Sequence, residues 1–355
     1  MGKVSGGMAS CRASRIRGRQ SSGTGTEDFQ CEAPPGAAEV SRRRKPALTR
    51  GMPSIRVPAF AKVNLRLDVL ARRADGYHEL RTIFQSISLH DTLQLERSRN
   101  RGIELDILSD SVLAAGSQRD NLVWRAAEAF RRHVRFPGGV RITLNKRVPV
   151  ARGLGGGSSD AAATLAGLSR LTKRRIAPEQ LLEIAAGLGA DVPFFLFGGR
   201  ALGTSRGDEV YPLPDGQRQT LLVVAPRDIA VRTSDAYGWL DRRLTKNPDN
   251  PRLWSFCALC WSPQEDHLSN EFETVVFRRY PRLARIRRVL LRGGAAEAAL
   301  AGSGSAVFGI FPNPAQARRS ARLFPEDQVF LCSTLSRKAY TRALWGPGAG
   351  GPSRL

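Results

Sequence analysis

Residues 149–163 read PVARGLGGGSSDAAA, and this stretch decides the fold expected for the whole chain. Residues 140–148 before it alternate apolar and polar side chains, which is the period of a half-buried strand. Residues 161–171 after it are rich in alanine and leucine, which is the composition of a buried helix. The sequence therefore predicts a strand, a glycine loop and a helix, in that order.

The glycine loop has the chemistry of a phosphate cradle. Its glycines, at positions 153, 155, 156 and 157, reach backbone angles closed to other residues and let an anion approach the amides. The helix start then presents its free N–H groups and the hydroxyls of Ser158 and Ser159. No lysine follows the glycines, so the loop is not a Walker A motif. A glycine turn that only packs the helix against the strand is the alternative.

Length and composition describe a globular chain with an excess of positive charge. The 355 residues suffice for one large or two ordinary domains, and 41% hydrophobic with 25% charged residues are ordinary values. No run of about 18 apolar residues occurs, so no transmembrane helix is expected. The net charge of +23 favours an anionic partner such as a nucleotide, although an arginine-rich genome would give the same excess. The basic residues are scattered, so we expect neither a nucleic-acid nor a membrane partner.

The cysteines bear on the compartment. The chain has five, an odd number at irregular spacing, which implies no disulfide framework and fits a reducing environment. Cys257 and Cys260 form a lone CxxC pair, for which apolar packing is a better interpretation than a zinc site. We therefore expect a cytoplasmic protein.

Composition divides the chain into four parts. Residues 1–51 are rich in Ser, Gly, Arg and Pro without apolar periodicity, which predicts a disordered basic extension or a start placed too early. The acidic residues in this extension disfavour a transit peptide. Residues 52–210 and 211–345 are expected to form two folded domains, with the boundary near 208–218. Residues 346–355 are expected to be a flexible tail.

Periodicity places strands and helices in a mixed order that is typical of an α+β fold. Strands are expected at 55–60, 63–70, 80–95 with a break near His90 and Asp91, 141–148, 220–226 and 329–334, together with a hairpin of 194–201 and 203–213 and a strand pair within 298–311. Helices are expected at 121–134, 161–171, 178–188, 234–244, 270–280, 281–291 and 314–323.

Three polar residues are candidates for catalysis. Lys62 and Asn64 alternate on a strand and so share one of its faces, with a solvent-facing edge as the alternative. Asp191 precedes Pro193, where an aspartate usually caps a turn. Phosphoryl transfer offers another role, because an acceptor hydroxyl needs a nearby carboxylate and a lysine beside that carboxylate keeps it ionised. Lys62 and Asp191 form such a pair if the fold brings them together.

A second glycine turn and an aromatic run complete the candidate set. Gly302, Ser303 and Gly304 form a turn between two predicted strands, for which a plain hairpin turn is the alternative. Tyr77 and His78 follow an Asp-Gly turn and present two rings that can stack on a base and hydrogen-bond to it. A core tyrosine beside a surface histidine is the alternative.

These stretches together resemble the GHMP kinases. Residues 61–64 resemble the first motif of that family, residues 149–159 the second and residues 300–306 the third. The run RADGYHEL at 73–80 is similar to one GHMP subgroup, whose substrate is a methylerythritol that carries a cytidine diphosphate. The likeness extends from about residue 55 to about residue 311, and more weakly to about residue 342.

The resemblance implies a two-lobed GHMP kinase fold, with a ribosomal S5 domain 2-like N-terminal lobe and a ferredoxin-like C-terminal lobe. It implies an enzyme that transfers a phosphate from ATP, with Mg²⁺, to the 2-hydroxyl of that small-molecule substrate in isoprenoid precursor synthesis. A monomer or a weak homodimer is expected. The alternatives are a GHMP kinase for mevalonate derivatives, homoserine or a sugar, a nucleic-acid-binding protein, and a GHMP fold that binds ATP without turnover.

The resemblance also assigns roles to individual residues. Lys62 and Asp191 would be the catalytic pair, and Ser158 or Ser159 would supply a hydroxyl to the metal. The residues expected at the substrate are Asn64, Tyr77, His78 and Tyr237. The third-motif loop expected to close on the site is Gly302, Ser303 and Gly304. The residues expected to hold ATP are Pro149, Val150, Ala151, Arg152, Gly153, Leu154, Gly155, Gly156, Gly157, Ser158 and Ser159.

Overall fold

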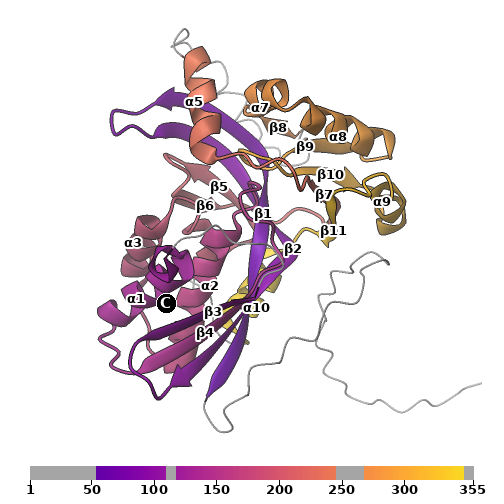
Figure 1. Cartoon of the computed structure of the whole chain (residues 1–355). Helices are drawn as coiled ribbons and strands as arrows, with labels where there is room; N and C mark the ends of the chain where they lie inside the picture. Colours follow the sequence, from indigo (N-terminus) through magenta and orange to yellow (C-terminus); the bar gives the residue numbers. More distant parts are fainter. Residues whose placement is uncertain (1–52, 109–116, 245–267, 348–355) are drawn as a thin grey trace, which may run out of the picture. The chain divides into compact units, whose positions relative to one another are not determined.

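The computed structural model describes residues 53–108, 117–244 and 268–347. Within these residues the strands form one seven-stranded and one four-stranded sheet, both accompanied by helices (Figure 1). This mixture of helices and mostly antiparallel strands confirms the expected α+β class. The predicted disordered extension, the Cys257–Cys260 pair and most of the predicted tail lie outside the described residues.

The first sheet is built around one long antiparallel hairpin of β1 and β2, which dominates Figure 1. The turn between them contains Gly76 at a φ of +85°, a conformation that favours glycine. In spatial order the sheet contains β3 (Ile103–Leu108), β4 (Gly139–Asn145), β2 (His78–Ser98), β1 (Ser54–Arg72) and β8 (Ser269–Asn270), while β5 (Arg200–Thr204) pairs with β2 and β6 (Glu209–Pro212) pairs with β5.

Two expectations for this hairpin are only partly correct. The strands expected at 55–60 and 63–70 are one continuous strand, and β2 continues through His90 and Asp91. The pairing is irregular at the expected places, because its register shifts between Phe60, which pairs with His90, and Lys62, which pairs with Ser86. Asp91 is tolerated inside β2 because its buried carboxylate has partners, including the backbone N–H of Val148, which donates to Oδ1 over 2.8 Å.

The hairpin expected from 194–201 and 203–213 is wrong at its start. Phe194–Phe197 form the short helix α4, and the hairpin consists of β5 and β6 only. A short apolar run has the same composition in a buried helix as in a buried strand, so periodicity could not separate the two.

One face of the first sheet is covered by helix α2, which is buried on almost every side (Figure 1). Its residues 161–166 are fully buried, and this explains why an alanine-rich rather than an amphipathic sequence forms it. Tyr340 and Leu344 of the last helix pack into the same core. The helices of this part are α1 (Leu122–His133), α2 (Gly156–Thr172), α3 (Pro178–Leu188), α4 and α10 (Arg337–Trp345).

The second sheet contributes its two faces to two different cores. Leu222 and Val224 pack in a core with helices, whereas the alternate residues Leu221 and Val223 join a core shared with β1 and β2. The strand order is β11 (Gln328–Ser333), β7 (Thr220–Ala225), β10 (Val307–Phe311) and β9 (Glu297–Leu300), and the helices of this part are α5 (Thr233–Leu244), α7 (Glu273–Arg279), α8 (Pro281–Arg292) and α9 (Pro314–Ala321).

Most other elements agree with the sequence. The expected helices at 121–134, 161–171, 178–188, 234–244, 281–291 and 314–323 are confirmed, as are the strands at 141–148, 220–226 and 329–334 and the strand pair within 298–311. The helix expected at 270–280 is shorter, since α7 begins at Glu273 and Asn270 belongs to β8. Strands β3 and β8 and helix α10 were not predicted. No described helix combines the length and the apolarity that crossing a membrane requires.

The domain limits at 52–210 and 211–345 stay a prediction. Two elements that follow residue 211 lie with the first sheet, because β8 pairs with β1 and α10 packs under α2. An isolated bridge between Ile87 and Thr334 also joins the two sheets.

Candidate active site

A cavity of about 840 Å³ is lined by β1, the glycine loop, the turn before α4, helix α5 and the second glycine loop. It collects nearly all the residues that the sequence singled out. Ser159 and Gly304 are the exceptions, since neither lines it. The predicted residues that do line it are Lys62, Asn64, Tyr77, His78, Asp191, Tyr237, Gly302, Ser303 and the loop from Pro149 to Ser158.

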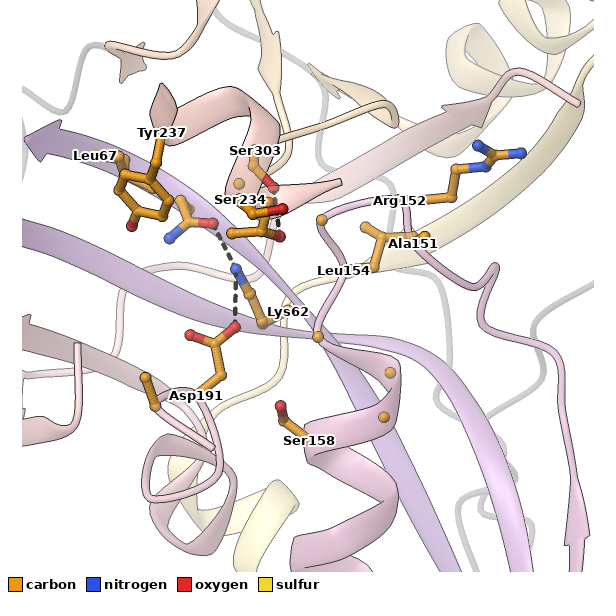
Figure 2. A pocket seen from close by; sticks show the side chains of 18 of the residues that line it. Lys62, Leu67, Ala151, Arg152, Leu154, Ser158, Asp191, Ser234, Tyr237 and Ser303 are labelled. Carbon is orange, nitrogen blue, oxygen red and sulfur yellow. Dashed lines mark hydrogen bonds and ion pairs between the residues drawn. The ribbon is translucent and has the colours of Figure 1, made fainter. Parts of the chain in front are cut away.

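The ammonium group of Lys62 lies between two oxygen atoms (Figure 2). Its Nζ donates a hydrogen bond to Asn64 Oδ1 over 2.8 Å and lies 3.5 Å from Asp191 Oδ2. Asn64 in turn donates through Nδ2 to Thr82 Oγ1 over 2.7 Å. The Lys62 side chain is only 5% exposed, so the facing carboxylate offsets part of the cost of burying its charge. The structure thus brings together the two groups that the sequence proposed as a pair.

Asp191 lies in the turn between α3 and α4 and points its carboxylate at Lys62 (Figure 2). Its side chain is 34% exposed, so the carboxylate can be reached from the cavity. Within the described part of the chain this carboxylate accepts no hydrogen bond from a backbone amide, which removes the turn-capping alternative. A reachable carboxylate beside a buried ammonium can orient a hydroxyl and accept its proton.

The glycine loop enters α2 through residues with positive φ. Gly153 and Gly155 have φ values of +76° and +70°, and Gly155 precedes the first residue of the helix. A Cβ on Gly153 would lie 1.8 Å from the carbonyl oxygen of Ala301, so the position has no room for a side chain. The backbone N–H of Lys62 donates to the carbonyl of Leu154 over 3.0 Å, which attaches the loop to β1 beside the ammonium group.

The two serines of the loop have different surroundings. Ser158 lines the cavity on the first turn of α2 (Figure 2), and its hydroxyl makes no hydrogen bond with the described residues. Ser159 Oγ is buried away from the cavity and has no partner in the same part of the chain. No side chain caps α2, so its first N–H groups face the loop without a side-chain acceptor.

The second glycine loop packs on the first, backbone against backbone. Gly302 has a φ of +53°, and a Cβ there would lie 2.9 Å from the carbonyl oxygen of Gly153. The N–H of Ala306 donates to the carbonyl of Arg152 over 3.2 Å. Asn270, which was expected to begin a helix, instead donates through Nδ2 to the carbonyl of Gly302 over 2.7 Å. The two loops therefore pack directly against each other and form one wall of the cavity.

The side chain of Arg152 points away from Lys62 (Figure 2). Its guanidinium donates to the carbonyl groups of Arg227 and Ile229, and it lies 3.2 Å from Ser305 Oγ. Burial lowers the pKa of this guanidinium. Arg152 thus links the glycine loop to the segment after β7.

Hydroxyl groups line the wall opposite the Lys62–Asp191 pair. Ser234 and Ser303 lie on that side of Lys62 in Figure 2. The hydroxyl oxygens of Thr233 and Ser303 are 3.0 Å apart. The sequence placed Ser234 in a helix but gave neither it nor Thr233 a role, because no local pattern shows that this helix start would face the lysine.

Aromatic side chains gather where α5 meets the β1–β2 turn. His78 stacks on Tyr237, with ring centroids 4.4 Å apart and an interplanar angle of 16°. Tyr77 is 54% exposed, and the guanidinium of Arg206 lies 4.7 Å from its ring centroid. His78 is buried, which rules out a core tyrosine beside a surface histidine. Burial raises the pKa of Tyr237, so its phenol stays protonated.

A second buried lysine, Lys146, lines the cavity and was not singled out from the sequence. Lys146 Nζ lies 2.5 Å from Asp91 Oδ2 and 2.8 Å from Asp160 Oδ2. Burial alone would lower the pKa of Lys146, but the two carboxylates outweigh it and raise that pKa. Burial raises the pKa of Asp160 well above its usual value, since one lysine cannot neutralise two carboxylates. The available signal was a lysine shortly before Pro149 and an aspartate directly after Ser159.

Comparison with known protein families identifies two matching regions. Residues 121–199 match the GHMP kinases N terminal domain, and residues 256–324 match the GHMP kinases C terminal domain. The first region contains the glycine loop and Asp191, and the second contains the loop of Gly302.

Curated relatives extend the match over most of the chain. The 4-diphosphocytidyl-2-C-methyl-D-erythritol kinase of Solibacter usitatus is 46% identical over 292 residues, which cover 81% of this chain and 90% of that protein. The protein of the same name from Moorella thermoacetica is 42% identical over 285 residues, covering 78% of this chain and 96% of that protein.

Solved structures agree with these relatives. A crystal structure of 4-(cytidine 5'-diphospho)-2C-methyl-D-erythritol kinase superposes with a TM-score of 0.65 at 36% identity, covering 79% of this chain and 99% of that chain. A homoserine kinase from Cytophaga hutchinsonii superposes with a TM-score of 0.60 at 18% identity over 82% of this chain and 98% of its own, which shows a shared fold. The expected two-lobed GHMP kinase fold is confirmed.

Proposed function

This chain belongs to the 4-diphosphocytidyl-2-C-methyl-D-erythritol kinases of the GHMP family, and we propose that Lys62 and Asp191 carry out the phosphoryl transfer. The enzyme phosphorylates the 2-hydroxyl of 4-diphosphocytidyl-2-C-methyl-D-erythritol with ATP, in isoprenoid precursor synthesis that does not pass through mevalonate. The observation that supports the residue assignment is the 3.5 Å separation of Lys62 Nζ and Asp191 Oδ2 beside the glycine loop.

In the proposed mechanism the acceptor hydroxyl of the substrate lies against Asp191. The hydroxyl oxygen attacks the γ-phosphorus of ATP, the bond from that phosphorus to the bridging oxygen breaks, and ADP leaves. The hydroxyl proton passes to Asp191 and from there to solvent, which its 34% exposure allows. Lys62 keeps Asp191 ionised before the transfer and balances the negative charge on the acceptor oxygen during it.

The polyphosphate of ATP is proposed to lie on the glycine loop at the start of α2. The uncapped first turn of that helix and its dipole favour negative charge there. The contact between Gly153 and Gly302 leaves the loop little freedom, so its amides are already arranged for the phosphates.

The described residues fit a Mg²⁺ ion that is held mainly by ATP. They include no cluster of three or more His, Cys, Asp or Glu side chains that could hold a metal by itself. Ser158 has a cavity-lining hydroxyl without a partner among them, so it is the proposed ligand in preference to the buried Ser159. When bound, Mg²⁺ neutralises charge on the phosphate oxygens and keeps several waters.

The cytidine end of the substrate is proposed to meet the aromatic wall. Tyr77, His78 and Tyr237 line the cavity there and offer ring faces and a buried imidazole. Asn64 lies nearer the reacting groups, since it shares a hydrogen bond with Lys62.

A panel of acceptors tests this function. With ATP, the cytidine substrate should give ADP and a product with a new phosphomonoester signal in its ³¹P NMR spectrum. With mevalonate or homoserine as the acceptor, the enzyme should form ADP at least about 100-fold more slowly than with the cytidine substrate, because these acceptors make no contact with the aromatic wall. A faster reaction with either of them, or ATP binding without turnover of the cytidine substrate, would contradict the proposal.

A further inference from the structure

Helix α5 holds the imidazole of His78 by two contacts. Tyr237 and Asp241 are four residues apart and so lie on the same side of the helix. Tyr237 stacks on the face of the His78 ring, and Asp241 Oδ1 lies 2.5 Å from His78 Nε2 at its edge. Asp241 also lines the cavity, and its side chain is 28% exposed. No sequence pattern indicated that Asp241 would contact His78.

The carboxylate of Asp241 determines which nitrogen of His78 carries the proton. An ionised carboxylate only accepts hydrogen bonds, so Nε2 must donate. In a neutral imidazole the other nitrogen, Nδ1, is then an acceptor. Nδ1 has no hydrogen-bond partner among the described residues, and His78 lines the cavity. The cavity therefore offers a ligand one hydrogen-bond acceptor of fixed identity.

We propose that Asp241 is a positioning residue that makes the site prefer cytosine over uracil by fixing the tautomer of His78. The inference rests on the cytidine substrate of the proposed function. On the hydrogen-bonding edge of cytosine only the 4-amino group donates, whereas the 4-oxygen of a 4-carbonyl pyrimidine accepts. An acceptor at Nδ1 pairs with the amino group, and the carbonyl of uracil would place a second acceptor against it.

This arrangement predicts a preference for cytosine over uracil, and not only tight binding of cytosine. A site built to pair with one polar group rejects an analogue that leaves the protein atom without a partner. The buried position of His78 strengthens the effect, because water cannot readily replace the missing donor. The preference for cytosine over uracil therefore depends on Asp241, although Asp241 need not contact the base.

The variant Asp241→Asn removes the fixed tautomer, because an asparagine amide can either accept from Nε2 or donate to it. We expect kcat/KM for the cytidine substrate to fall about 10- to 100-fold, as for a mispaired buried polar group. The uridine counterpart should change by less than about 3-fold, and the KM for ATP should not change. Asp235→Asn on the same helix is the matched control, since Asp235 is exposed and makes no contact with His78.

Two measurements need no phosphoryl transfer. In ¹⁵N NMR of the unsubstituted enzyme, His78 should show a protonated Nε2 and an unprotonated Nδ1, and CMP should shift Nδ1 more than Nε2. Calorimetry should show that CMP binds more tightly than UMP, and that Asp241→Asn reduces this preference about 10-fold or more. The NMR result on the unsubstituted enzyme decides the matter if the variant fails to fold.

A protonated Nδ1 in the unsubstituted enzyme would overturn the inference. Equal losses with the cytidine and uridine substrates would also overturn it, since Asp241 would then only support the fold. If CMP preference depends on Asp241 while no cytidine substrate is phosphorylated, the inference stands and the proposed function fails.

Discussion

Two lysines in the described part of the chain are buried against carboxylates, and these carboxylates differ in exposure. Lys62 faces Asp191, which is 34% exposed, whereas Lys146 faces Asp91 and Asp160, which are 0% and 4% exposed. Lys146 and Asp160 also line the cavity, but a substrate hydroxyl can reach the more exposed Asp191 more readily. The ion pairs of Lys146 join β2, the segment after β4 and α2. In the proposed mechanism the pair with the more exposed carboxylate reacts, and the more buried cluster holds these elements together.

The largest expected effect belongs to Asp191→Asn. The amide keeps the shape of the side chain but cannot accept the hydroxyl proton, so kcat should fall by on the order of 10³-fold. ATP affinity should change little. The free energy of unfolding should fall less than in a fully buried pair, because Asp191 is partly exposed and Asn64 Oδ1 still accepts from Lys62. A coupled ADP-release assay with the cytidine substrate measures the loss. Turnover within about 5-fold of the unsubstituted enzyme would place the reacting carboxylate elsewhere.

Lys146→Met tests the other half of the comparison. It leaves the buried carboxylates of Asp91 and Asp160 without their shared cation, so the free energy of unfolding should fall by about 3 kcal/mol. Urea denaturation followed by circular dichroism measures this change. A variant as stable as the original chain, with kcat reduced as much as in Asp191→Asn, would show that the two lysines have been assigned the wrong way round.

The glycine loop lies between the two lysines. The variant Gly155→Ala would place a methyl group against the side chain of Lys62. Gly155 has a φ of +70°, and a Cβ there would lie 2.6 Å from the Phe195 ring and 3.2 Å from Lys62 Cγ. We expect a loss of about 2 kcal/mol in stability and a higher KM for ATP. Thermal unfolding and initial rates measure the two effects.

The control for that variant is Gly102→Ala. Gly102 also has a positive φ, +108°, but a Cβ there would meet nothing within 4 Å. The variant Gly102→Ala should lower the free energy of unfolding only by the backbone strain, about 1 kcal/mol, and should leave the KM for ATP unchanged. Equal effects of the two substitutions would mean that strain, and not contact with the lysine side of the loop, determines the result.

The smallest expected effect is a pH dependence in the structural cluster. Because burial raises the folded-state pKa of Asp160, the folded chain binds this proton more tightly than the unfolded chain does. The contribution of Asp160 to stability is therefore lost as pH rises from its ordinary pKa of about 4 to the raised value. Asp160→Asn should abolish that loss, because an amide does not titrate.

Denaturation at several pH values measures this difference, and other titrating groups cancel between the two proteins. Parallel stability profiles of Asp160→Asn and the unsubstituted chain would contradict the assignment of a shared, proton-binding cluster.

The contrast between the two lysines also shows how far the sequence could lead. Alternation along one strand identified Lys62 with Asn64, and the requirement of phosphoryl transfer for a carboxylate identified Asp191. The Lys146–Asp91 pair could not be found that way, because the residues are 55 positions apart and meet only through the pairing of β2 with β4. Asp91 was interpreted as a break in a strand, since its burial makes sense only once its partner is known.

Other elements were missed for physical reasons of the same kind. Phe194–Phe197 has no period that separates helix from strand, and α10 is specified by the packing of Tyr340 into a distant core. The contact of Asp241 with His78 depends on how α5 approaches the hairpin. The cytoplasmic location, the monomer or weak homodimer and the nature of residues 1–51 stay predictions.

A double-mutant cycle on Lys62 and Asp191 tests most directly whether they act as one unit. The rate of phosphoryl transfer would be measured by rapid quench at saturating ATP and cytidine substrate for Lys62→Met, Asp191→Asn and the double variant. We predict that the double variant is little slower than the slower single variant, which corresponds to a coupling of about 2 kcal/mol or more. Losses that simply multiply would contradict the account, because the two side chains would then act independently.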